Sequence, residues 1–167
     1  MSDLIIDHQQ ALEPAIDSRQ FRNTLGQFAT GVIVIATEHQ GEIHGMTANA
    51  FMSGSMSPPL IIVSVDKRAR MHALLQATGR YSVSMLADTQ AHLSRHFAGQ
   101  PQTDKPVNFI DYHGQPVLEG ALAWLTTGVH HQYDCGDHTL FVGRVQSLGQ
   151  RTGCGALGFH RGEYTAL

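Results

Sequence analysis

The chain has 167 residues, a formal net charge of −3, 42% hydrophobic residues and 15% charged residues. This length predicts one domain with a substantial core. The composition argues against a long disordered segment, and the lack of a basic cluster argues against a nucleic acid or an anionic membrane surface as partner.

The sequence also lacks a recognisable membrane span or leader. No apolar run approaches the roughly 20 residues that cross a bilayer, and residues 1–10 carry acid where a signal peptide would have a basic region. Two cysteines, Cys135 and Cys154, are too few for a disulfide framework and indicate reduced thiols. We therefore expect a cytoplasmic protein in which residues 1–16 are a lead-in and residues 17–167 form the domain.

The first predicted element is a short amphipathic helix that ends near Gln27. Asp17 and Gln20 have the spacing of a capping box in which an acid replaces the hydroxyl residue. Phe21, Leu25 and Phe28 then fall on one helical face. We expect this apolar stripe to pack into the core.

A predicted strand pair follows. Residues 31–37 are apolar and β-branched, residues 39–42 form a turn containing glycine, and residues 43–51 return. The second half of the return strand, residues 45–51, consists of small, hydroxyl and amide residues instead of valine and isoleucine. This change predicts a backbone-lined ligand shelf, and an ordinary strand end with a bulge is the alternative.

A third strand is predicted at residues 60–65, ending in a charged junction at residues 66–70. Three cations occupy four positions of this junction, and the next helix begins there. Cations at a helix start oppose the helix dipole, so a bound phosphate or solvent would have to compensate them. We favour phosphate, because the junction terminates a core strand. Three residues give the helix its apolar face and a glycine ends it: Met71, Leu74, Leu75 and Gly79.

The rest of the chain predicts further strands separated by turns and one more helix. These segments are a strand at 81–86, a helix from Asp88 to about 98, a polar loop at 100–115, an extended segment at 117–133, a turn at 134–137, a partner strand at 139–145 and a closing segment at 157–164. Seven or so strands and three short helices without βαβ alternation indicate an antiparallel barrel with helical inserts.

Two suggestive patterns fail on inspection. Residues 153–158 match G-x-G-x-x-G, but only nine residues follow, so the helix, second strand and ribose-binding acid of a Rossmann unit cannot fit. Among eleven histidines, His92 and His96 share a helical face, and Cys135 and His138 have a spacing that some zinc sites use. Neither pair has the second pair that a tetrahedral site needs, so we expect no metal.

Five segments, taken in order, resemble the short-chain flavin reductases. They are Phe28–Val32, Gly45–Phe51, Asp66–Lys67, Gly136–Phe141 and Arg161–Tyr164, and the likeness covers about residues 21–164. The chain is most similar to the reductase components of two-component aromatic monooxygenases, such as the phenol, 4-hydroxyphenylacetate and styrene systems.

The resemblance implies a mainly β protein with short helices, an antiparallel Greek-key split β-barrel of the FMN-binding type, usually a homodimer. It implies reduction of FMN or FAD by NADH or NADPH, with reduced flavin supplied to a flavin-dependent monooxygenase. Such chemistry needs few acids, because hydride passes directly between the two cofactors. Two alternatives remain: a flavoprotein reducing a bound acceptor such as ferric iron or a corrinoid, and a non-catalytic flavin- or haem-binding module of the same shape.

Carried over by position, the resemblance implies contacts to the flavin from two segments, Thr30, Gly31, Val32 and Met46, Thr47, Ala48, Asn49, Ala50, Phe51. It places Asp66, Lys67 and Arg70 by the phosphate, Gly136, Asp137 and His138 on the nicotinamide side, and Tyr164 as the residue that closes the pocket. His138 is assigned as an orienting or charge-balancing group; a proton donor and a simple turn residue are the alternatives.

Two departures from the family pattern affect the site. Many relatives have a serine at the helix start where this chain has Ala69, which removes one hydroxyl contact to phosphate. Relatives often have bulky residues where this chain has Gly158 and His160. Removal of these two bulky groups would open the pocket edge, so the preference for FMN or FAD and for NADH or NADPH stays open.

Overall fold

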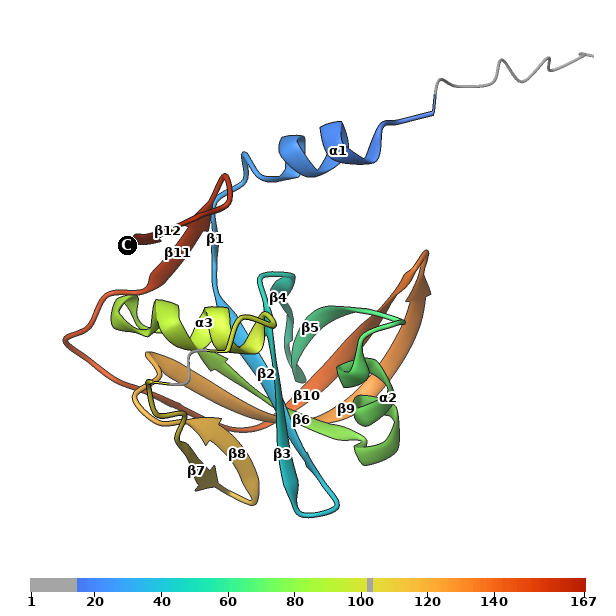
Figure 1. Cartoon of the computed structure of the whole chain (residues 1–167). Coiled ribbons are helices and arrows are strands. Elements are labelled where there is room, and N and C mark those ends of the chain that lie inside the picture. The colour runs from blue at the N-terminus through green and yellow to red at the C-terminus, as the bar shows by residue number, and fades with distance from the viewer. Residues whose placement is uncertain (1–14, 102–103) are drawn as a thin grey trace, which may run out of the picture.

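The computed structural model describes residues 15–101 and 104–167 (Figure 1). The helices are α1 (Ser18–Leu25), α2 (Arg70–Thr78) and α3 (Ala91–Phe97), with a 3₁₀ turn, η1, at Asp88–Gln90. The strands are β1 (Thr30–Gly31), β2 (Ile33–His39), β3 (Glu42–Ala48), β4 (Phe51–Met56), β5 (Pro59–Asp66), β6 (Arg80–Met85), β7 (Phe109–Tyr112), β8 (Gln115–Leu118), β9 (Ala123–Cys135), β10 (His138–Gln150), β11 (Leu157–His160) and β12 (Glu163–Ala166).

Seven strands form the main sheet in the order β3-β2-β6-β9-β10-β5-β4, and all neighbours in it are antiparallel. Its two edge strands, β3 and β4, are consecutive in the chain, and only Asn49 and Ala50 separate them. A connection this short spans at most about 11 Å, so the edges of the sheet must come together. No ladder joins β3 to β4 among the described strands. The result is a barrel that is open along one seam, and the predicted fold class is confirmed.

The hairpin at the beginning of the barrel has the predicted turn. β2 pairs with β3 from Ile33↔Ala48 to His39↔Glu42. The two central residues, Gln40 and Gly41, both have positive φ, which matches the twist of the flanking strands.

Two apolar clusters support the barrel. The first fills the barrel and includes Ile35, Val63, Val83 and Phe141 together with the buried face of α2. The second lies under α3 and β11 and includes Val34, Leu86, Leu93, Leu118 and Leu157. The alternating side chains of β2 serve both clusters, because successive residues of a strand point to opposite faces.

Helix α1 begins as predicted, but its packing differs from the prediction. The Asp17 carboxylate accepts a hydrogen bond from the backbone N–H of Gln20 at 2.7 Å. The apolar stripe is not in the core: Phe21, Leu25 and Phe28 are 54%, 57% and 76% exposed. Figure 1 shows α1 standing away from the barrel, joined to it through β1. Amphipathic spacing predicted which face is apolar, but it did not predict that this face would lie exposed outside the barrel core.

Several predicted boundaries were wrong. The returning strand predicted at residues 43–51 breaks at Asn49, and residues 51–56 form a further strand, β4, with a bulge between Ser53 and Ser55. The polar loop predicted at 100–115 contains β7. Weak strands with polar or small residues are stabilised by neighbouring strands, which local composition does not reveal.

The Rossmann interpretation is excluded by the structure as well, because β11 begins at Leu157, inside the glycine-rich segment, and no helix follows it. None of the helices in residues 15–101 and 104–167 has the length and apolar character needed to traverse a lipid bilayer.

Candidate functional site

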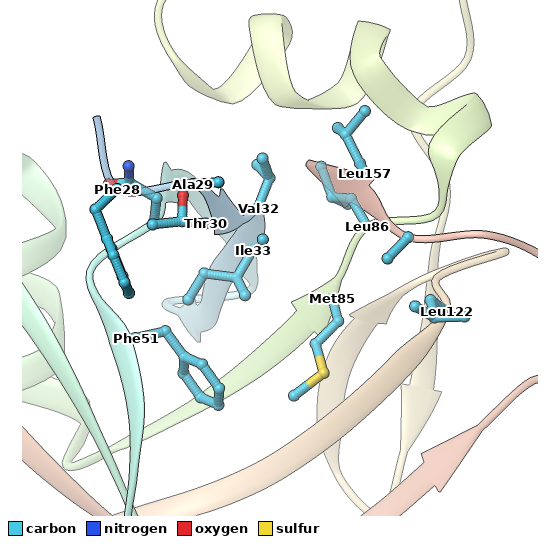
Figure 2. A pocket seen from close by; sticks show the side chains of 13 residues that line it. Phe28, Ala29, Thr30, Val32, Ile33, Phe51, Met85, Leu86, Leu122 and Leu157 are labelled. Carbon is cyan, nitrogen blue, oxygen red and sulfur yellow. The ribbon is translucent and has the colours of Figure 1, made fainter. Parts of the chain in front are cut away.

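A cavity of about 410 Å³ lies at the seam of the barrel. Figure 2 shows Phe28 and Phe51 on one side of it and Met85, Leu86, Leu122 and Leu157 on the other. Its walls come from the chain before β2, the β3–β4 connection, β6 and β11. We call this space the seam cavity. Its volume is in the range typical of small-molecule sites, and its lining is mainly apolar with few polar groups.

The seam cavity contains a polar atom that no protein group satisfies. The hydroxyl of Thr30 is buried, and within the described residues it has no hydrogen-bond partner. Next to it, a Cβ added at Gly31 would meet no heavy atom within 4 Å. A buried hydroxyl without a partner is costly, so this wall fits a ligand with a polar edge. The open space at Gly31, which lines the cavity, leaves room for a planar ring, so these residues fit a flavin.

A second, smaller cavity of about 190 Å³ adjoins the first, and the two share Val32 and Asn49 in their walls. We call it the inner cavity; it lies between the end of β3, helix α3 and the β11–β12 hairpin. Thr47 lines it, but the Thr47 hydroxyl donates to the backbone carbonyl of Ser94 at 2.7 Å. Thr47 therefore holds α3 against β3. Its hydroxyl oxygen can still accept a hydrogen bond from a ligand, but it cannot donate one.

Tyr164, predicted to close the pocket, lines the inner cavity. Its hydroxyl lies 2.8 Å from the Ser94 hydroxyl, and the guanidinium of Arg95 stands 5.0 Å from the centre of its ring. Beyond Tyr164 is an open cavity of about 540 Å³, the outer cavity, whose lining includes Arg95, Phe159 and Glu163. Tyr164 and Phe159 thus separate the inner cavity from the outer one.

Except for Arg70, the predicted phosphate and nicotinamide residues form a separate cluster, because β5 pairs with β10. His138 stands opposite Asp66 in the register, and the Lys67 backbone N–H donates to the carbonyl of Asp137 at 3.0 Å. None of the cluster residues is in the lining of the seam or inner cavity. Asp66 is three residues along β5 from Val63, the partner of Phe51, which corresponds to about 10 Å.

Protein carboxylates compensate two of the three cations at this junction. Arg68 pairs with Asp66 at 2.8 Å, and Lys67 lies 3.3 Å from Asp134 and donates to the carbonyl of Gly136 at 3.0 Å. The hypothesis that phosphate or solvent compensates these charges was therefore incomplete. The sequence did not indicate the ion pair of Lys67, because Asp134 lies in the distant β9–β10 hairpin.

Two carboxyl groups of the cluster have lowered pKa values. Hydrogen bonds from the guanidinium and then the backbone N–H of Arg68 hold the pKa of Asp66 well below its usual value. The pKa of Asp137 is lowered mainly by its 2.7 Å hydrogen bond with Nδ1 of His138. Because Nδ1 is engaged, Nε2 is the ring nitrogen of His138 that faces outward for a ligand.

Two predicted flavin contacts lie elsewhere. Met46 and Arg70 line a fourth cavity, of about 350 Å³, between β3 and α2. Met46 also packs against the barrel core. Successive side chains of a strand point to opposite faces, so Met46 lies on the face of β3 opposite to that of Thr47. Arg70 reaches the same space from α2.

The structure therefore brings together half of the predicted set at the seam. Thr30, Gly31, Val32, Asn49 and Phe51 line the seam cavity, and Thr47, Ala48 and Tyr164 join at the inner cavity. Ala50 lies on the connection, where its carbonyl accepts from the N–H of Ser64. Sequence reasoning missed the lining residues of β6 and β11 and the buried Ser94; the only local signal was a serine between Leu93 and Phe97 on the apolar face of a helix.

Comparison with known proteins agrees with this geometry. Residues 25–167 match the family model of the flavin reductase like domain. An NADH-dependent flavin reductase of Rhodococcus sp is 42% identical over 159 residues, covering 93% of this chain and 90% of that protein. The reductase component of 4-hydroxyphenylacetate 3-monooxygenase from Thermus thermophilus is 38% identical over 128 residues, or 77% of this chain and 82% of the relative.

A solved structure gives the same result for the fold. The NADH:FAD oxidoreductase SgcE6 of Streptomyces globisporus C-1027, in complex with NAD and FAD fragments, superposes with a TM-score of 0.82 at 35% identity. The match covers 92% of this chain and 96% of SgcE6. With a family model that matches most of the sequence and relatives of similar length, this chain belongs to the flavin reductase like domain family.

Proposed function

We propose that this protein is an NADH-dependent flavin reductase that reduces FAD or FMN and supplies the reduced flavin to a partner monooxygenase. The observation that carries the proposal is the seam cavity, with its unpartnered Thr30 hydroxyl and its open wall at Gly31. The relatives support the nucleotide, the flavin and the partner, because their names specify NADH, FAD and a monooxygenase.

A flavin supplies a hydride acceptor when bound. The protein therefore needs to bind the two cofactors, orient their rings and exclude water. Phe28, Phe51, Met85 and Leu86 provide apolar walls that keep water from the ring. Thr30 and the chain around Asn49 provide polar contacts at the ring edge. No acid or base of the chain has to change protonation for hydride transfer itself.

The β5–β10 cluster serves the polar tails of the cofactors in this proposal. Lys67 directly follows Asp66, which lies about 10 Å along β5 from Val63, the partner of Phe51; in this proposal the side chain of the flavin crosses that region. Its partner Asp134 is exposed, so an arriving phosphate can compete for the ammonium. His138 orients or balances charge through Nε2, while Asp137 fixes the ring through Nδ1.

The direct test is NADH oxidation by the purified protein in the presence of excess flavin. We expect absorbance at 340 nm to fall and oxidised flavin to bleach under anaerobic conditions, with no change when either flavin or protein is omitted. The spectrum recorded before any addition distinguishes a tightly held flavin from one that binds as a substrate. Absence of flavin-dependent NADH oxidation with FMN and with FAD would overturn the proposal.

The same proposal includes a homodimer in which the apolar face of α1 packs on a second copy. Phe21 and Leu25 on α1 and Phe28 just after it are all exposed, and contiguous apolar patches mark interaction sites. The helix is tied to its own barrel at its end, where Arg161 donates to the carbonyl of Gly26 and to the Gln27 side chain. Phe28 also forms the rim of the seam cavity, so a partner at α1 would cover that rim.

We expect the substitution Leu25→Asp to convert the dimer into a monomer, because it places a charge in the apolar face of α1. Sedimentation velocity at micromolar concentration measures the change. Asn23→Asp adds the same charge beside it on the polar face of the helix and should leave the dimer intact. A Leu25→Asp protein that sediments as the wild type does would refute this interface.

The proposal extends to domain limits and compartment. Residues 17–167 form the flavin reductase domain with residues 1–16 as a lead-in, of which residues 1–14 lie outside the described residues; the family match over residues 25–167 supports the domain. A cytoplasmic location is supported by the two free thiols, Cys135 and Cys154.

A further inference from the structure

Ser94 occupies a junction between three parts of the site. It lies on α3 and is fully buried, with 0% exposure. Its backbone carbonyl accepts the hydroxyl of Thr47 from β3 at 2.7 Å, and its own hydroxyl meets that of Tyr164 from β12 at 2.8 Å. One residue thus connects the strand at the seam with the C-terminal hairpin.

The hairpin that carries Tyr164 is continuous with the wall of the seam cavity. β12 pairs with β11, β11 pairs with β1 at Thr30↔Phe159, and Leu157 at the start of β11 lines the cavity. Outside the backbone ladders, the Ser94–Tyr164 contact and the stacking of Arg95 on Tyr164 attach this hairpin to α3. Loss of the Ser94 hydroxyl would therefore remove the hydrogen bond that fixes the position of the Tyr164 hydroxyl, while the ring keeps its contacts with Arg95 and Phe159 and the strand pairing stays intact.

Tyr164 stands between the inner and the outer cavity. The seam cavity, at about 410 Å³, suits one large planar ring, and the inner cavity next to it shares Phe159 and Tyr164 with the outer cavity. Tyr164 lines the inner and outer cavities and not the seam cavity. A shift of its ring would change access for the second ligand more than the fit of the first.

We propose that Ser94 is a positioning residue that fixes the Tyr164 ring and thereby shapes the site of the hydride donor. The proposal rests on the proposed function, since it takes flavin as the ligand of the seam cavity and NADH as the ligand that enters past Tyr164. Ser94 contacts neither cofactor; it acts through the tyrosine.

The test compares Ser94→Ala, Tyr164→Phe and the double variant with the wild type. Each single substitution removes one partner of the same hydrogen bond, so we expect each to raise KM for NADH about three- to tenfold. The KM for flavin should change less than twofold. The change in kcat should be smaller than the change in KM for NADH. The double variant should resemble either single variant, because the bond is lost only once.

A binding measurement separates this inference from the proposed function. The dissociation constant of NAD⁺, measured by calorimetry on each protein with flavin present, requires no turnover and should rise in parallel with KM. If the wild type binds NAD⁺ but does not oxidise NADH, the proposed function fails while the comparison of affinities still tests Ser94. Wild-type protein with no affinity for NAD⁺ would overturn the role of Ser94.

Ser82→Ala is the matched control, because Ser82 is equally buried and its hydroxyl donates to the carbonyl of Pro116, away from all three cavities. It should lower thermal stability without changing the affinity for NAD⁺ or NADH. If Ser94→Ala behaves as Ser82→Ala does, or if the Ser94 and Tyr164 effects add, Ser94 has only a structural role.

Discussion

Replacing Gly31 by leucine is expected to weaken flavin binding by about tenfold to a hundredfold without unfolding the protein. A side chain at this position meets no protein atom within 4 Å, and the φ of Gly31 is outside the left-handed region, so the backbone accepts it. The added carbons instead enter the seam cavity, where overpacking against a bound ring costs about 1–3 kcal/mol. Titration of flavin fluorescence gives the affinity, and thermal melting confirms that the fold persists.

A graded series sharpens this prediction. Gly31→Ala, Gly31→Val and Gly31→Leu should weaken binding in the order of their volumes if the effect is steric. Glu38→Leu, on an exposed position of β2 outside the cavity, adds a comparable apolar side chain and should bind flavin normally. Unchanged flavin affinity in a folded Gly31→Leu protein would mean that the ring binds elsewhere.

Gly143→Ala is expected to be the most destabilising single-methyl substitution in the barrel, lowering the free energy of unfolding by about 3 kcal/mol. Gly143 is on β10, and a Cβ there would lie 2.8 Å from Cζ of Tyr81 and 3.0 Å from Cβ of Thr127, with the Tyr81 hydroxyl closer still. Tyr81 cannot move aside easily, because its ring is fully buried and its hydroxyl donates to the carbonyl of Phe141 at 3.2 Å. Urea unfolding followed by the fluorescence of the single tryptophan, Trp124, measures the change.

A double-mutant cycle identifies the cause of that loss. Tyr81→Phe removes the nearest atom, so it should cost less stability in the Gly143→Ala protein than in the wild type. Gly31→Ala is the control for adding a methyl group, and it should leave stability within about 0.5 kcal/mol. All proteins are compared at one concentration, because dimerisation would make unfolding concentration-dependent. Additive effects would show that Tyr81 is not the obstacle.

The local elements were largely predictable because their signals are short-range. The capping carboxylate of Asp17, the positive-φ turn at Gly41 and the αL cap at Gly79 each depend on a few neighbouring residues. β4 and β7 were missed, since β4 contains small residues, β7 is a short strand within a mostly polar segment, and each pairs with a neighbouring strand, β5 or β8. Where composition did not predict a strand, pairing with a neighbouring strand therefore determined that one forms.

The site shows the same division. Thr30, Gly31, Asn49 and Phe51 were assigned to the flavin from their order in the chain, and the seam cavity gathers them in one wall. The pairing of β5 with β10 likewise brings Asp66 beside His138. No local pattern indicated that carboxylates would neutralise the cationic junction, because the partner of Lys67 comes from a hairpin 67 residues further along.

By itself, the sequence determined the class of fold and the family, since these follow from strand-forming runs, turns and the order of short motifs. The tertiary structure alone decided that two edge strands meet at a seam, that the apolar face of α1 lies outside the core, and that Ser94 links β3 to the C-terminal hairpin. The physical reason is that closure, burial and buried hydrogen bonds depend on which distant segments become neighbours, and local propensity does not contain that information.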